Sequence, residues 1–213
     1  MSTKDQARQE RAAKLAAVQA AQRGKERRRA ILVISGVAVV AAILIGVTVS
    51  VVLGEQNRQN ALEEAAAAPI EGVVETTGLE ATHVTGAVDY EQTPPVGGNH
   101  SGTWANCGIY TAPTVDEEAV HSLEHGAVWI TYDPALPADQ LKVLTDLAQG
   151  EPYVLLSPYE GVPSPVVATA WGLQLELDDA GDPRLEQFVV KYQQGEQTLE
   201  PGAPCSGGSG TPA

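Results

Sequence analysis

The sequence predicts a single N-terminal transmembrane helix followed by a compact α+β domain, with two helices packed on one face of a mainly antiparallel sheet. Two observations lead to this fold class. Residues 30–54 form a run of 25 residues without a charged side chain, and residues 127–192 show segments in the order β-α-β-β-α. The length of 213 residues suits one folded domain with extensions rather than two full domains.

The first 29 residues differ in charge from the rest of the chain. They carry nine Lys or Arg against three Asp or Glu, so with a total of −14 the remainder has a net charge of −20. A domain so acidic repels phosphates, which argues against a nucleic-acid partner. Leu15 and Val18 are almost the only bulky apolar residues before Arg29. We therefore predict residues 1–29 as a basic cytoplasmic tail that is disordered or a marginal helix.

The uncharged run 30–54 is long enough to cross a bilayer. As a helix it would extend about 37 Å, against a hydrocarbon core of about 30 Å. A cleavable signal peptide is the alternative, but its apolar core is normally only about 7–15 residues long. Arg27, Arg28 and Arg29 precede the run and only Arg58 closely follows it. The positive-inside rule therefore predicts a single-pass plasma membrane protein with a cytoplasmic N-terminus and the C-terminal domain outside.

Residues 55–69 are predicted to form a stalk, because their alanine-rich stretch favours a helix until Pro69 stops it. The folded domain is then expected over residues 70–205. Residues 206–213 are rich in Gly and Ser, which predicts a flexible C-terminus. Within the domain, the predicted strands and helices are, in order, a strand over 127–132, a helix over 137–148, strands over 153–157 and 166–177, and a helix starting at 182–183 and ending by Gly195.

All four histidines lie within residues 83–125 of this domain. His121 and His125 are spaced i and i+4, which on a helix places two imidazoles on one face where they can bind one ion. His100 ends a loop containing two prolines and two glycines that can direct a side chain inward. Imidazoles together with a carboxylate such as Glu117 would suit Zn²⁺ or Cu²⁺. The predicted metal ligands are His83, His100, His121, His125 and Glu117.

Two alternatives compete with a metal-binding module. The histidines can form a structural polar network in an interaction module of the cell envelope that binds no metal. His121-Ser-Leu-Glu-His125 also matches the HxxEH pattern of inverted zinc peptidases, in which Glu124 would polarise a metal-bound water. That pattern needs a long helix, whereas Gly126 and a predicted strand follow at once. The sequence therefore favours a protein that is not an enzyme, and it indicates no particular protein partner.

Cys107 and Cys205 are the only cysteines. In an oxidising compartment such a pair predicts a disulfide that closes a loop of roughly 100 residues and pins the C-terminal end to the histidine region. The alternative, a Cys107 thiolate as a metal ligand, would leave Cys205 unpaired.

Three segments carry a resemblance to a known family: 94–100 (PPVGGNH), 104–110 (WANCGIY) and 120–128 (VHSLEHGAV). They resemble the bacterial membrane-anchored family called domain of unknown function 3105, over roughly residues 70–205. Similarity to its actinobacterial branch extends through 157–159, 170–172 and 200–202. The resemblance implies a single-pass anchor and an extracytoplasmic domain but no established activity. The four histidines and Glu117 match the polar motif positions of that family.

Overall fold

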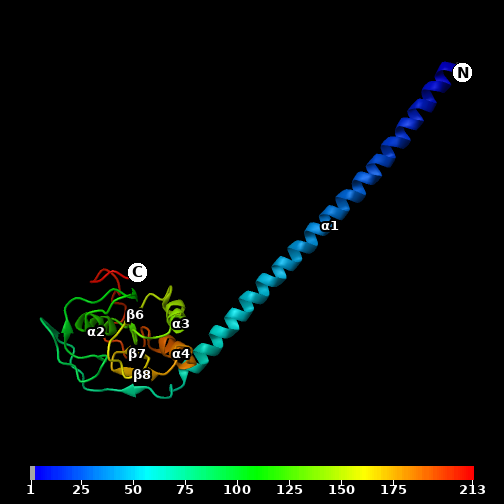
Figure 1. Ribbon diagram of the computed structural model, residues 1–213. Coiled ribbons are helices and arrows are strands. Elements are labelled where there is room, and N and C mark those ends of the chain that lie inside the picture. The colour runs from blue at the N-terminus through cyan, green and yellow to red at the C-terminus, as the bar shows by residue number, and fades with distance from the viewer. Residues whose placement is uncertain (1–2) are drawn as a thin grey trace. The chain divides into compact units, whose positions relative to one another are not determined.

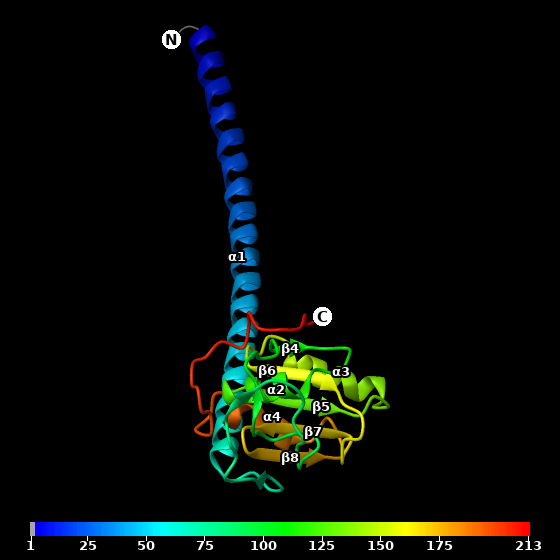
Figure 2. The same cartoon turned by 90° about the vertical axis from the view of Figure 1, so that its left-hand side faces the viewer.

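The computed structural model describes residues 3–213, and the chain divides after Arg58 into two units, which are described separately (Figures 1 and 2). The described part of the first unit is residues 3–58 of a long helix, α1 (Thr3–Ala67), and residues 59–67 of α1 belong to the second unit. The helix ends two residues before Pro69, as expected for a residue that cannot continue a helix.

Within the described residues 3–213, α1 is the one helix long and apolar enough to cross a membrane. A signal sequence near the N-terminus would pass the same test of length and composition. Two hydroxyls inside the apolar run are satisfied by the helix itself: Thr48 Oγ1 and Ser50 Oγ donate to the carbonyls of Leu44 and Gly46, both at 2.9 Å. Such internal bonds are what a lipid environment requires of polar groups.

The second unit is built on a six-stranded sheet in the order β1-β8-β7-β5-β6-β4 (Figure 2). Three of its neighbouring pairs are antiparallel and two are parallel, so the predicted mainly antiparallel α+β fold is confirmed. A separate pair of parallel strands joins β2 to β3. The strands are β1 (Val74–Glu75), β2 (His83–Val84), β3 (His100–Ser101), β4 (Gly108–Ile109), β5 (Val128–Tyr132), β6 (Val154–Pro158), β7 (Val166–Ala170) and β8 (Leu173–Leu177).

One face of the sheet is covered by the two helices that the sequence predicts, α3 (Ala138–Ala148) and α4 (Pro183–Tyr192). Alternation along the strands directs Val128 and Ile130 to this face. The main apolar core forms there, and it fully buries Leu144 of α3 and Phe188 of α4.

The opposite face is covered by a third helix, α2 (Asp116–Glu124), beyond the two that the sequence analysis assigned to the domain. Its Val120 and Leu123 pack in a smaller cluster with Trp129 and Leu155. With only nine residues, α2 is too short to show a clear helical repeat in the sequence.

The segment 166–177 is a hairpin rather than one strand. β7 and β8 are antiparallel, with Ala170 opposite Leu173, so Trp171 and Gly172 form a two-residue turn. Gly172 has φ +72°, which glycine adopts without the strain of a side chain. The turn brings Trp171 beside the His100 ring.

The C-terminal end is held by backbone hydrogen bonds, unlike the flexible end that the sequence predicts. Residues 206–213 are predicted to be flexible, but they lie along the segment that follows β3. Ser209 forms a bridge with Ala105, its N–H donates to Trp104 O, and Ala213 N–H donates to Ile109 O, both at 2.8 Å. A Gly- and Ser-rich composition removes side-chain packing but leaves backbone groups free to pair with a neighbouring segment.

Candidate metal centre

Helix α2 presents three polar side chains on one face. His121, Glu124 and His125 are spaced i, i+3 and i+4, so they lie within one turn of each other. The helix ends where Gly126 (φ +91°) donates its N–H to Leu123 O and Ala127 donates to Ser122 O, the pattern of a Schellman motif. This ending fixes the last turn, which carries Glu124 and His125.

The other two histidines come from the short parallel pair of strands. His83 in β2 lies directly opposite His100 in β3, and His100 N–H donates to Thr82 O at 3.1 Å. β3 is in contact with α2. The pairing therefore delivers both side chains to the helix face that carries His121.

Four of these side chains form a group that can hold a metal ion: His83, His100, His121 and Glu124 each offer one ligand atom, all within 4.8 Å of one another. The imidazole of His83 stacks on that of His121 at 4.7 Å between ring centroids, and His100 lies edge-on at 5.0 Å from His121. His100, His121 and Glu124 are buried, whereas the His83 side chain is 50% exposed. The group is thus closed on the protein side and opens to solvent at His83.

Each buried imidazole uses its Nδ1 in the same way. Nδ1 lies 2.7 Å from Gly98 O in His100, 2.7 Å from Ser101 O in His121 and 2.8 Å from Pro204 O in His125. A carbonyl oxygen can only accept, so Nδ1 carries the hydrogen in all three rings. In a neutral ring the lone pair then resides on Nε2. Metal-binding histidines are held in this way by a hydrogen bond from the other nitrogen.

The Nε2 atoms of these rings lie close to a carboxylate oxygen or to the Nε2 atom of another histidine. His100 Nε2 is 3.0 Å from Glu124 Oε2, and His121 Nε2 is 2.9 Å from His125 Nε2. His83 Nε2 is 3.4 Å from the same Glu124 oxygen. If the rings are neutral, the Nε2 lone pair of His100 faces a lone pair of Glu124 Oε2, and the Nε2 lone pairs of His121 and His125 face each other. Such an arrangement is favourable only with a cation, either a proton or a metal, held between the two acceptors.

Burial also disfavours the protonated form of His121. The pKa of His121 is lowered, chiefly because burial penalises the charged ring; the hydrogen bond to Ser101 O opposes this, and the neighbouring histidines add to the lowering. A lowered pKa means that the Nε2 lone pair stays available below the pH at which an ordinary histidine protonates.

The structure does not bring Glu117 to this group, although the sequence analysis names it as a ligand. Its Oε1 accepts the N–H of Val88 at 2.8 Å. The other two acids of the first helical turn are also occupied: Asp116 accepts from Tyr159 Oη at 2.8 Å, and Glu118 accepts from Ser209 Oγ. Carboxylates at a helix N-terminus are favoured by the helix dipole, so this turn has a structural use for all three.

The carboxylate at the centre is Glu124, which the sequence analysis considers only as the base of a hydrolase. Its i+3 spacing from His121 makes it a candidate ligand, but Glu117 at i−4 is an equal candidate by spacing.

His125 extends the centre towards the C-terminal segment. Its Nε2 lies 3.5 Å from Glu200 Oε2, and the Trp104 ring covers it at 4.9 Å between centroids. Glu200 N–H donates to Glu124 O at 3.0 Å, which ties the segment to the end of α2. His125, which the sequence analysis names as a metal ligand, thus lies beside the group of four rather than within it and faces a second carboxylate.

The two cysteines are paired beside this segment. The sulfur atoms of Cys107 and Cys205 lie 1.93 Å apart across a sequence separation of 98, and Cys107 N–H donates to Cys205 O at 2.7 Å. The pairing agrees with the predicted disulfide and leaves neither sulfur as a thiolate ligand. Because Pro204 precedes Cys205, the disulfide also holds the carbonyl that orients His125.

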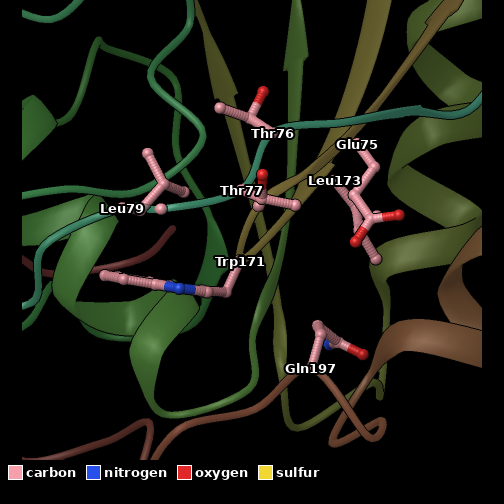
Figure 3. Close-up of a pocket in the computed structure, with 9 residues that line it drawn as sticks. Glu75, Thr76, Thr77, Leu79, Trp171, Leu173 and Gln197 are labelled. Atoms are coloured by element: carbon pink, nitrogen blue, oxygen red, sulfur yellow. The ribbon is translucent and has the colours of Figure 1, made fainter.

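Trp171 also lines a pocket of about 260 Å³ (Figure 3). The ring centroids of Trp171 and His100 are 5.8 Å apart. Trp171 belongs to the smaller apolar cluster beneath α2, and Leu79 packs against that cluster. The pocket is lined by Thr76, Thr77, Leu173, Gln197 and a single charged residue, Glu75, besides Trp171, Leu79 and two glycines. Since it offers no imidazole or thiol, it does not extend the metal centre.

Comparison with known proteins adds one finding. No curated protein matches this chain, and no solved structure does. A family model described as "Protein of unknown function (DUF3105)" matches residues 83–207. The matched region begins at His83 and contains every histidine, both cysteines, Glu124 and Glu200. The chain belongs to the DUF3105 family.

Proposed function

We propose that this protein binds a divalent transition metal ion, Zn²⁺ or Cu²⁺, in the centre formed by His83, His100, His121 and Glu124. The observation that supports the proposal most strongly is the shared use of Nδ1. Three buried rings donate Nδ1–H to backbone carbonyls and thereby direct Nε2 lone pairs towards one another and towards a carboxylate. A cation held between these acceptors makes the geometry favourable.

The ligand set fits these ions chemically. Imidazole nitrogen with one carboxylate oxygen is a ligand type that Zn²⁺ and Cu²⁺ share, and four donors match a tetrahedral Zn²⁺ site. The half-exposed His83 provides an entry path for the ion. The carbonyls of Gly98 and Ser101, in one segment, orient the rings of His100 and His121, and that of Pro204, in another, orients the neighbouring His125, so the fold itself supplies the preorganisation.

The proposal places this centre outside the cell. The basic tail before an apolar run favours a single plasma membrane span with a cytoplasmic N-terminus. A disulfide in the C-terminal domain fits an oxidising compartment. Protease added to intact cells should then digest the C-terminal domain while the basic tail stays protected. Protection of the C-terminal domain would reverse the orientation.

The main test is calorimetric titration of the metal-stripped full chain, in detergent, with Zn²⁺ and separately with Cu²⁺. Saturable binding at neutral pH is expected. His121→Ala should abolish tight binding because it removes the ligand that contacts both His83 and His125. Absence of saturable binding in the wild type would favour the alternative, a structural network in which protons take the place of the ion.

Two carboxylates on α2 give a matched pair of variants. Glu124→Gln should weaken metal binding by at least about tenfold, since loss of even an outer partner of a ligand costs roughly 10–100-fold. Glu117→Gln should leave binding unchanged, because Glu117 instead accepts a backbone N–H. Equal effects of the two variants would refute the assigned ligand set.

The same pair addresses the hydrolase alternative. A zinc peptidase would retain metal and lose peptide cleavage in Glu124→Gln, because a general base is not itself a ligand. The proposed centre predicts the opposite pattern: metal affinity falls and the wild type shows no cleavage to lose.

A further inference from the structure

The donors of the centre divide into two similar sets. Glu124 Oε2 lies 3.0 Å from His100 Nε2 and 3.4 Å from His83 Nε2. His125 Nε2 lies 2.9 Å from His121 Nε2 and 3.5 Å from Glu200 Oε2. Each set contains two imidazoles and one carboxylate, which are ligand types that a divalent transition metal takes and which leave coordination positions open.

The second set is not an accidental surface contact. His121 and His125 are both 3% exposed, and their Nδ1 atoms are committed to the carbonyls of Ser101 and Pro204. Their Nε2 atoms therefore face each other as two acceptors. Glu200 is held near them because its own N–H donates to Glu124 O at 3.0 Å. A cation between these atoms would relieve the facing lone pairs.

We propose that the centre binds two divalent transition metal ions, the first by His83, His100 and Glu124 and the second by His121, His125 and Glu200. This inference rests on the proposed metal-binding function. A neutral imidazole has one lone pair, so His121 can hold one ion only. It serves as fourth ligand of the first ion when a single ion is bound, and it turns to the second ion when both are present.

The two ions should differ in affinity. The first set includes buried Glu124, whereas the Glu200 side chain is 53% exposed. Repulsion between two dications at close range also opposes occupancy of the second site, and the two carboxylates offset only part of it. The second ion is therefore the weaker and more readily exchanged, which gives the centre one retained ion and one that can be passed on.

The experiment is a Zn²⁺ titration of the metal-stripped full chain in detergent, with the bound zinc then measured by elemental analysis. Two ions per chain with two distinct affinities are expected. Glu200→Gln should reduce the stoichiometry to one and leave the tight site unchanged. Glu160→Gln, which changes an exposed glutamate outside the centre, should retain two. Because Glu200 is half exposed, its substitution is not expected to prevent folding, and tryptophan fluorescence checks this.

Copper gives an independent readout. Two equivalents of Cu²⁺ should produce an electron paramagnetic resonance spectrum with dipolar coupling between the ions, and Glu200→Gln should restore the spectrum of an isolated ion. One ion per chain in the wild type, unaffected by Glu200→Gln, would overturn the two-ion inference and leave the proposed function standing. Absence of any bound ion would overturn both.

Discussion

The face of the six-stranded sheet that α3 and α4 cover is closed by aliphatic side chains and Phe188, whereas the face that α2 covers meets a helix with buried imidazoles and a buried carboxylate. The first face needs only hydrophobic burial to hold its helices. The second has a smaller apolar cluster, and its segments are joined by hydrogen bonds from histidine and by a disulfide. The comparison teaches that the two faces are held together differently, the first by apolar burial and the second partly by cross-links, and that the group proposed to bind metal lies on the cross-linked face.

If the second face depends on its cross-links, loss of the disulfide should have the largest effect on stability. Cys107→Ser with Cys205→Ser should lower the free energy of unfolding by roughly 4–5 kcal/mol, because the pair closes a loop of about 100 residues in the unfolded chain. Urea unfolding followed by tryptophan fluorescence measures this, since all three tryptophans lie after residue 100. Wild-type protein treated with a reductant serves as the control. A loss below about 1 kcal/mol would mean that the second face does not depend on the disulfide.

On the apolar face, Phe188→Ala should cost about 3–5 kcal/mol, since a fully buried ring leaves a cavity. Metal stoichiometry of the folded protein should not change, because Phe188 packs in the main apolar core, on the face of the sheet opposite α2. Val190→Ala, at an exposed position of the same helix, is the matched control with little expected effect. A change in stoichiometry with Phe188→Ala would show that the two faces are coupled.

Acid should destabilise the histidine face of the metal-free protein. The pKa of His121 is lowered in the folded state by burial, so the unfolded chain binds a proton more readily. The free energy of unfolding should therefore fall as the pH drops from about 7 through the unfolded pKa of about 6.5 and on to the lowered folded pKa. His121→Gln should reduce this dependence in metal-free urea titrations at several pH values. An identical pH profile in this variant would contradict the assigned cause.

The smallest expected effect is that of Glu117→Gln on stability. Its carboxylate accepts one backbone N–H, from Val88, and a neutral amide oxygen can still accept that bond. A loss within about 1 kcal/mol is expected from urea unfolding. A loss of several kcal/mol would indicate that the first turn of α2 contributes more than the contact explains.

The predictability of the two faces from sequence differs for a physical reason. Helical spacing places Leu144 on one side of its helix, and alternation at Leu173, Leu175 and Leu177 marks a strand, so the apolar face can be inferred from local pattern. The hairpin turn at Trp171-Gly172 was missed because Trp171 reads as a strand residue. The register of β2 with β3, which places His83 opposite His100, depends on a loop without periodicity.

Only the part of the histidine centre that depends on local spacing can be predicted from the sequence. The i, i+4 pair His121 and His125 is a local feature, and it was identified. Glu117 and Glu124 both lie one turn or less from His121, so spacing alone could not choose between them. The choice is made by tertiary contacts: Glu117 meets the Val88 N–H, whereas Glu124 meets His100. Such contacts have no signature in a single sequence.

The central claim is that imidazoles of this domain bind a divalent transition metal, and X-ray absorption at the zinc edge tests it most directly. The full chain in detergent would be loaded with one equivalent of Zn²⁺. A shell of nitrogen and oxygen ligands at about 2.0–2.1 Å, with the outer-shell scattering of several imidazoles and no sulfur, is the predicted result. A shell of water oxygens only, or one containing sulfur at about 2.3 Å, would contradict the account.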